Sequence, residues 1–227
     1  MNYKYLWFDL DNTLLNFHAS SKVSFRQMME SWNLDGDLAA YKAYSVFNKK
    51  CWSDYEQGII DQRTLKKIRF QQYFDSIGHD FNGLEANMIY LQGIIDNPVP
   101  IDGAESLLAF ANKNGYICDV ITNGMKEAQR PRISKINWNQ HFRHIFVSDE
   151  IGVAKPQTRF FEHCLKAAGA PPKDEILVIG DSIETDILGA KNYGVTSCWM
   201  NPSRKVNPPD IIPDYEITTL DELYDII

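Results

Sequence analysis

The chain has 227 residues, of which 44% are hydrophobic, and its formal net charge is −7 at pH 7. Acidic and basic side chains are mixed along it, which argues against nucleic-acid polymers and membrane surfaces as partners, because both select clustered Lys and Arg. No apolar stretch reaches the roughly 20 residues that a membrane-spanning helix needs. The first ten residues carry Asp9 and lack the basic leader of a signal peptide, so we expect a cytoplasmic protein.

Short β-rich runs alternate with helical patterns over most of the chain. The predicted strands are Tyr5–Phe8, Ile117–Thr122, His144–Ser148, Ile176–Ile179, Thr196–Met200 and Tyr215–Ile217. The predicted helices between them are Ala104–Asn114, Lys126–Ile136, Gln157–Ala168 and Thr185–Tyr193. Three of these helices stop at a glycine, the residue that enters the left-handed region without steric cost. The alternation predicts a doubly wound α/β fold with a mostly parallel, Rossmann-like core sheet.

One region lacks strand patterns and is predicted to be helical throughout. Its helices are expected over Ser24–Trp32, Leu38–Tyr55, Gln62–Ile77 and Leu84–Ile95. A helical domain inserted directly after the first strand, over residues 17–97, accounts for this break in the pattern. The α/β core domain is then expected to comprise residues 1–16 and 98–227.

Two carboxylates follow the first predicted strand, in the segment Asp9-Leu10-Asp11-Asn12-Thr13. Ligands of parallel sheets bind beyond the carboxyl ends of the strands, where this segment falls. Carboxylates at i and i+2 of an extended chain project to the same side, and two such anions attract a cation or a shared proton. One carboxylate could then act as a nucleophile and the other could transfer protons. An Asp-Asn turn that ends a strand is the alternative reading.

The second predicted strand ends in Thr122-Asn123-Gly124, immediately before a helix. A hydroxyl, an amide and backbone N–H groups at the start of a helix can hold a phosphate, although ordinary strand-to-helix turns use the same residues. Lys155 lies beside another predicted helix start, with Pro156 expected as the first helical residue. The helix dipole disfavours a cation there, so Lys155 is predicted to offset phosphate and carboxylate charge, with a solvated surface lysine as the alternative.

A third group of carboxylates follows the strand Ile176–Ile179, in the segment Gly180–Asp186. Asp181 would complete an all-oxygen site with Asp9 and the backbone carbonyl of Asp11, and Mg²⁺ suits that set of ligands. Asp186 would either support the site from outside the ligand set or pair with Lys155. Acidic residues that cap a helix are the alternative explanation.

These four motifs occur in order, each at a predicted strand end, and together they resemble the haloacid dehalogenase-like (HAD) phosphohydrolase superfamily. The helical insertion also lies where that superfamily places its first type of cap domain. By this resemblance Asp9 is the nucleophile and Asp11 the general acid and base. The remaining roles implied are phosphate binding by Thr122, Asn123, Gly124 and Lys155, magnesium binding by Asp9, Asp11 and Asp181, and support by Thr13 and Asp186.

The resemblance implies a magnesium-dependent phosphomonoester hydrolase that works through an aspartyl phosphate. Mg²⁺ and Lys155 would neutralise the phosphate oxygens while Asp9 attacks in line. Asp11 would protonate the leaving alcohol and then deprotonate the attacking water. The dehalogenases of the superfamily lack an acid at the position of Asp11 and need no metal, so dehalogenation is disfavoured.

A narrower resemblance links the chain to the cytosolic bacterial pyrimidine 5′-nucleotidases. The segments that carry it are Trp7-Phe8-Asp9 with Leu14 and Phe17, Trp52-x-x-Tyr55-x-x-Gly58, Ile121–Gly124, Val153–Pro156 and Cys198–Asn201. It implies a nucleoside monophosphate as the small phosphorylated substrate, with Trp52 and Tyr55 available to stack on the base. Packing of both rings within the cap's own interior is the alternative. Pro131 departs from the pattern, so no role is assigned to Arg130 or Arg132.

Other activities stay open on this sequence. A phosphatase for a sugar phosphate or phosphoglycolate would share the catalytic residues and differ only in its cap contacts. A phosphomutase would have to shield its aspartyl phosphate from water. A non-catalytic binding protein on the same fold, or a phosphate-accepting receiver domain, belongs to a different class, although a receiver domain is much shorter and has no helical cap.

Overall fold

The computed structural model describes residues 3–227 and consists of two compact units. The core unit comprises Met1–Phe17 and Val99–Ile227, and the helical unit comprises His18–Pro98. Each of these boundaries lies one residue beyond the expected one. The role of the helical unit as a lid that selects the substrate stays a prediction.

A parallel sheet forms the centre of the core unit, with its strands in the spatial order β3-β2-β1-β4-β5-β6. The strands are β1 (Tyr5–Phe8), β2 (Ile117–Thr122), β3 (His144–Val147), β4 (Ile176–Gly180), β5 (Thr196–Met200) and β6 (Tyr215–Ile217). β1 lies between β2 and β4, so successive strands are added on opposite sides of it. Such a switch point opens a crevice at the carboxyl ends of the strands, where ligands of α/β proteins bind.

The strand register brings the predicted motifs to this crevice. Phe8 is aligned with Val120 of β2 and with Ile179 of β4. The segments that begin at Asp9 and Gly180 therefore leave the sheet at nearly the same level as Thr122. Residues more than a hundred positions apart in sequence thus become neighbours at one edge of the sheet.

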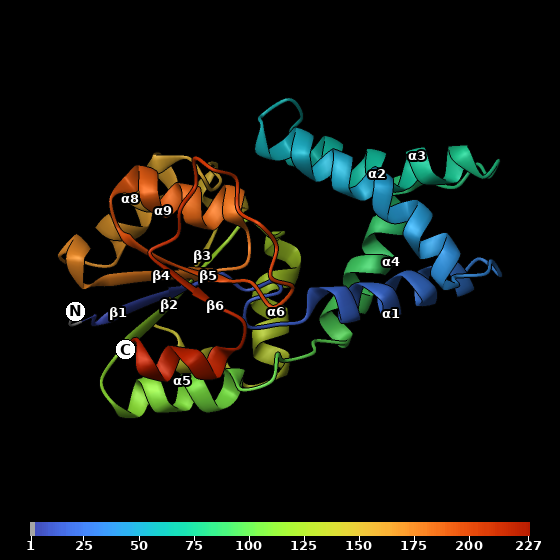
Figure 1. Cartoon of the computed structure of the whole chain (residues 1–227). Helices are drawn as coiled ribbons and strands as arrows, with labels where there is room; N and C mark the ends of the chain where they lie inside the picture. The colour runs from blue at the N-terminus through green and yellow to red at the C-terminus, as the bar shows by residue number, and fades with distance from the viewer. Residues whose placement is uncertain (1–2) are drawn as a thin grey trace. The chain divides into compact units, whose positions relative to one another are not determined.

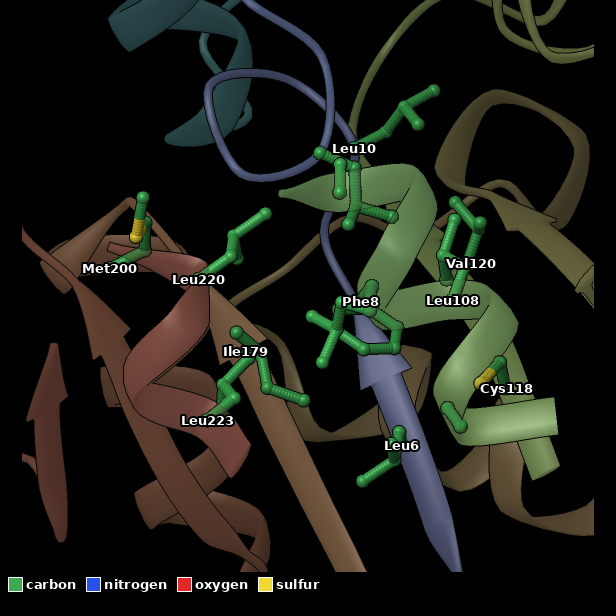
Figure 2. Close-up of a cluster of buried hydrophobic side chains, with 14 of the residues drawn as sticks. Leu6, Phe8, Leu10, Leu108, Cys118, Val120, Ile179, Met200, Leu220 and Leu223 are labelled. Carbon is green, nitrogen blue, oxygen red and sulfur yellow. The ribbon is translucent and has the colours of Figure 1, made fainter. Parts of the chain in front are cut away.

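Helices cover both faces of the sheet (Figure 1). One face carries α5 (Ala104–Lys113) and the C-terminal 3-10 helix η4 (Leu220–Asp225), and the other carries α8 (Thr158–Ala167) and α9 (Leu188–Tyr193). Successive strand residues point to opposite faces. Leu6 and Phe8 therefore join the cluster under α5 and η4 (Figure 2), whereas Trp7 between them joins the cluster under α8. The other elements of the core unit are α6 (Lys126–Lys135), α7 (Ser148–Ile151), η1 (Asn139–His141), η2 (Lys173–Glu175) and η3 (Ile183–Ile187).

The helical unit is built around stacked aromatic rings. Its helices are α1 (Phe17–Glu30), α2 (Leu38–Glu56), α3 (Gln62–Ser76) and α4 (Gly83–Asp96). Tyr44 stacks on Phe25 and on Phe70, with ring centroids 5.0 Å and 4.7 Å apart. Asp37 and Asp61 cap α2 and α3 by accepting hydrogen bonds from backbone N–H groups of the first turn. Among residues 3–227, no helix has both the length and the apolar character to cross a membrane.

The predicted doubly wound fold, with helices inserted after the first strand, is confirmed. Two helix starts were predicted wrongly. α1 begins at Phe17 rather than at Ser24, because its early turns bury serines, which break the apolar periodicity that marks a helix. Pro156 is not helical, since α8 starts at Thr158. The predicted helix Thr185–Tyr193 is extended at its start by a single π turn, η3 (Ile183–Ile187), which leads into α9.

Candidate active site

Asp9 follows β1 directly, at the carboxyl edge of the sheet between β2 and β4. Its backbone N–H donates to the carbonyl of Ile179 at 2.8 Å, which keeps the chain extended beyond the strand. The side chain is buried, with Oδ1 accepting from Lys155 Nζ at 2.8 Å and Oδ2 accepting from the Thr13 hydroxyl at 3.4 Å. Both oxygens of Asp9 are thus held by neighbouring side chains.

Lys155 connects the strand ends through its buried ammonium group. Its three N–H bonds are matched by three acceptors, because Nζ donates to Asp9 Oδ1, to Asp186 Oδ1 at 2.5 Å and to the Ile121 carbonyl at 2.7 Å. Burial by itself would lower the pKa of Lys155, but the carboxylates of Asp186 and Asp9 outweigh it and raise the pKa. Of the two roles considered for Asp186, the structure shows the pairing with Lys155.

Asn123 and Gly124, which were expected to bind phosphate, contact their protein neighbours. Asn123 Nδ2 donates to the carbonyl of Lys155 and its Oδ1 accepts from the Lys155 N–H, each at 2.9 Å. The Gly124 N–H donates to Thr122 Oγ1 at 3.1 Å. Asn123 therefore fixes the main chain that carries Lys155, and Gly124 helps to orient the hydroxyl of Thr122.

Three carboxylates gather around one point of the site. One oxygen from each of Asp9, Asp181 and Asp186 lies within 4.8 Å of the others. Burial, followed by the neighbouring carboxylates, raises the pKa of Asp9 to about 7 and that of Asp181 to about 8, against the lowering effect of Lys155. When ionised, the three carboxylates and the Lys155 ammonium leave two uncompensated negative charges. Oxygen donors with this excess charge fit a divalent cation such as Mg²⁺.

Local features of the chain hold two of these carboxylates in place. A Cβ atom on Gly180 would lie 2.2 Å from a carboxylate oxygen of Asp186, so only glycine leaves room for this contact. The Ser182 N–H donates to that same oxygen, Asp186 Oδ2, at 3.1 Å, whereas Oδ1 accepts from Lys155. Trp199 Nε1 donates to the backbone carbonyl of Asp181 at 2.9 Å and so fixes the main chain at that residue.

The carboxylate of Asp11 accepts hydrogen bonds from side chains of α6. Arg132 Nη1 donates to its Oδ1 at 2.6 Å and Gln129 Nε2 donates to its Oδ2 at 2.9 Å. The metal set expected from sequence was Asp9, Asp11 and Asp181, whereas the side chains that converge are those of Asp9, Asp181 and Asp186. Whether the backbone carbonyl of Asp11 serves as a ligand stays a prediction.

Sequence reasoning missed Gln129 and left Arg132 without a role. Pro131 lies inside α6, and the helix continues through it. Gln129 and Arg132 are three positions apart, a spacing that places them on the same face of the helix. The three-residue spacing, in a helix that begins shortly after Thr122, is the sequence signal that could have identified Gln129 and Arg132 as site residues. Arg130 forms an ion pair with Glu150 at 2.7 Å instead.

A family model described as haloacid dehalogenase-like hydrolase matches residues 6–200. The chain belongs to this family. It is 30% identical over 227 residues to the pyrimidine 5′-nucleotidase YjjG of Escherichia coli, covering 100% of this chain and 99% of that protein. It is 34% identical over 238 residues to the glyceraldehyde 3-phosphate phosphatase of Pyrococcus furiosus, covering 99% and 92%.

A solved relative has nearly the same fold as this HAD-family protein. The structure of the HAD-hydrolase YfnB from Bacillus subtilis, bound to magnesium, aligns with a TM-score of 0.93 and 30% identity, covering 100% of this chain and 99% of that one. The six-stranded arrangement and the helices after β1 are therefore those of the HAD family. The resemblance stated from the sequence motifs is confirmed.

Trp52 and Tyr55 both lie on α2 of the helical unit. Their rings meet edge to face, with centroids 5.8 Å apart and an angle of 82° between the ring planes. Both side chains are partly exposed, and neither belongs to the buried aromatic interior around Tyr44. Stacking of these rings on a nucleotide base stays a prediction.

Proposed function

We propose that this HAD-family phosphatase hydrolyses nucleoside 5′-monophosphates with Mg²⁺ through an aspartyl phosphate on Asp9. The observation that supports the proposal most is the convergence of Asp9, Asp181 and Asp186 on the Lys155 ammonium at the carboxyl edge of the sheet. A buried site with two excess negative charges repels a phosphate ester until a divalent cation is present. The charge of the site therefore supports a metal requirement.

Asp9 and Asp181 would hold the metal, with the Asp11 carbonyl as a further ligand, and Asp186 lies within reach of the same point. When bound, Mg²⁺ supplies positive charge to the phosphate oxygens and helps to orient the ester. Asp9 is the nucleophile in this proposal, and Lys155 and Thr13 hold its two oxygens. Asp11 passes a proton to the leaving alcohol and later accepts one from water.

The metal site should make the stability of the protein depend on pH in an unusual direction. The pKa values of Asp9 and Asp181, about 7 and about 8, are raised above the usual value near 4, so the folded state holds these protons more tightly than the unfolded state. This contribution is fully present below about pH 4 and is lost as the pH rises through about 8. Metal-free protein should therefore lose thermal stability between about pH 5 and pH 8.

Mg²⁺ binds the ionised carboxylates, so the rise in Tm that it produces should be larger at pH 8 than at pH 5.5. Thermal unfolding with EDTA and with Mg²⁺ at both pH values measures the effect. Asp181→Asn should flatten the difference, since it removes one of the two titrating groups and one of the proposed metal ligands. An equal Mg²⁺ shift at both pH values would contradict the charge argument.

The finer substrate assignment rests on two observations. The E. coli relative of matching length is a pyrimidine 5′-nucleotidase, and the partly exposed rings of Trp52 and Tyr55 are aromatic groups of the kind on which a base stacks. A sugar-phosphate phosphatase is the second candidate, because the P. furiosus relative acts on glyceraldehyde 3-phosphate and is similarly close.

A panel of phosphate esters separates the two candidates. We expect kcat/KM for UMP or CMP to exceed that for glyceraldehyde 3-phosphate by at least about ten-fold. EDTA should abolish hydrolysis of every ester, and Mg²⁺ should restore it. Trp52→Ala should lower kcat/KM for the nucleotides more than that for glycerol phosphate, which has no base to stack. A preference for the sugar phosphates would favour the second candidate, and no metal-dependent hydrolysis at all would refute both.

A further inference from the structure

Arg132, Gln129, Thr122 and Asp11 form one hydrogen-bonded network beside the carboxylate cluster. Arg132 Nη1 donates to Gln129 Oε1 at 2.7 Å and to Asp11 Oδ1 at 2.6 Å. Gln129 Nε2 donates to Thr122 Oγ1 at 2.8 Å and to Asp11 Oδ2 at 2.9 Å. Gln129 is fully buried, and Arg132 and Thr122 are each 1% exposed. The network joins the phosphate-binding candidate to the proposed proton-transfer group.

Arg132 fixes the orientation of the side-chain amide of Gln129. A guanidinium group only donates hydrogen bonds, so the amide oxygen must point toward Arg132 and the NH₂ group toward Thr122 and Asp11. The opposite orientation would set the NH₂ group against a cation and the amide oxygen against a carboxylate. Both hydrogens of the Gln129 amide are then in use, one on Thr122 and one on Asp11.

The contacts of Thr122 Oγ1 also restrict where its hydroxyl hydrogen can point. A hydroxyl has one hydrogen to donate and two lone pairs to accept with. The lone pairs of Thr122 Oγ1 accept from the Gly124 N–H and from Gln129 Nε2. Its hydrogen therefore remains for a third partner, and a phosphate oxygen in the crevice is a suitable acceptor. An acceptor atom in place of Gln129 Nε2 would draw that hydrogen away from the crevice.

Two further observations show that neighbouring residues accommodate the network, in one case at the expense of stability. A Cβ atom on Gly124 would lie 1.8 Å from Gln129 Nε2, so Gln129 needs glycine at that position. Arg132 Nε and Nη2 are buried without an acceptor among residues 3–227, and the guanidinium carbon lies 5.8 Å from the centre of the Phe17 ring. Buried N–H groups that lack partners destabilise a fold. Within the part of the chain that the structure describes, the hydrogen bonds of the Arg132 side chain run to Asp11 and Gln129.

We infer that Gln129 is a positioning residue that orients the Thr122 hydroxyl toward the phosphate and holds the Asp11 carboxylate in place, and that Arg132 fixes Gln129 in this orientation. The inference rests on the proposed phosphatase function, because it assigns both groups a task in that reaction. Gln129 is expected to touch neither the metal nor the ester, and its effects pass through Thr122 and Asp11.

Two variants of Gln129 distinguish the effect of its hydrogen-bond donors from the effect of its size. Gln129→Met removes both donors with little change in size, and Gln129→Glu replaces the NH₂ group with an acceptor. We expect Gln129→Met to lower kcat for 4-nitrophenyl phosphate by about 10- to 100-fold. Inorganic phosphate should bind most tightly to the natural protein, less tightly to Gln129→Met and least tightly to Gln129→Glu, in which Thr122 turns its hydrogen to the glutamate. Calorimetric titration of phosphate with Mg²⁺ present measures this order without turnover.

A double-mutant cycle tests whether Gln129 acts through Asp11. In an Asp11→Asn background, Gln129→Met should lower kcat by less than about three-fold. Arg132→Met should resemble Gln129→Met in kcat, whereas Arg130→Met, which loses only the pair with Glu150, should stay within about two-fold of the natural kcat. Thermal unfolding of each variant shows that it is folded.

Equal losses from Gln129→Met in both backgrounds would overturn the inference, because a residue that merely supports the fold gives multiplicative effects. The inference would also be overturned if the Gln129→Glu variant bound phosphate as tightly as the Gln129→Met variant does. If the natural protein hydrolyses no phosphate ester, the proposed function fails. The order of phosphate affinities measured by calorimetry still decides the orientation of Thr122 in that case.

Discussion

Asp9→Asn should abolish turnover, with kcat for any phosphate ester reduced by at least about 10⁴-fold. An amide is a poor nucleophile, so the variant cannot form the acyl phosphate that divides the reaction into two easier steps. The side chain keeps its size, and its oxygen can still accept the hydrogen bond from Lys155. Release of inorganic phosphate in the presence of Mg²⁺, at enzyme concentrations high enough to detect the residual rate, measures the loss.

Asp119→Asn is the matched control for Asp9→Asn. Asp119 is a fully buried aspartate on the neighbouring strand β2, and it forms an ion pair with Arg143 at 2.8 Å. Its replacement should cost stability, because Arg143 loses its partner, and should leave kcat per folded molecule nearly unchanged. Retention of more than about one hundredth of kcat by Asp9→Asn would rule out the covalent route.

Lys155→Met should lose both activity and stability. The substitution removes the ammonium group that neutralises Asp9 and Asp186, and it leaves three carboxylates within 4.8 Å of one another. Breaking a buried ion pair by removing one partner typically costs about 3–5 kcal/mol of unfolding free energy. Loss of the charge beside the phosphate should also lower kcat/KM by about 10²- to 10³-fold. Chemical denaturation and steady-state kinetics measure the two effects.

Lys4→Met tests how much of this loss comes from the burial of Lys155. Lys4 donates to Glu175 at 2.9 Å, nearly the same distance as that between Lys155 and Asp9, but its side chain is 57% exposed. Exposed ion pairs contribute little to stability because water and salt screen them, so Lys4→Met should cost little stability and no activity. A similar loss from both variants would contradict the role given to the buried charge.

The strands and the positions of the motifs could be predicted because a parallel sheet is buried on both faces. Its strands are therefore continuous apolar runs, such as Ile176–Ile179, and the first polar residue after each run marks a strand end. Asp9 and Asp181 follow such runs, whereas β2 contains Asp119 and ends at Thr122 itself, so Thr122 was placed by its position before a predicted helix. The switch point at β1 then brings them together, since β1 lies between β2 and β4.

The partners of individual side chains could not be predicted in the same way. Asp11 is held by Gln129 and Arg132, which are 118 and 121 positions away in the chain, and no local periodicity reports a contact across a crevice. α6 also buries polar side chains where an amphipathic pattern would place apolar ones, and Pro131 was the reason that no role was assigned to Arg130 or Arg132. The side-chain contacts of Asn123 could not be predicted for a related reason, because an amide suited to phosphate is equally suited to the backbone of Lys155; phosphate binding by Asn123 stays a prediction.

In the proposed reaction, Asp9 carries the phosphoryl group between the two chemical steps. Rapid acid quenching of the enzyme with substrate and Mg²⁺, followed by borohydride reduction and peptide mass spectrometry, tests it directly. We expect homoserine at position 9 of the peptide from the natural protein, and none in the peptide from Asp9→Asn. Reduction at another carboxylate, or steady turnover with no modified peptide at any time point, would contradict it.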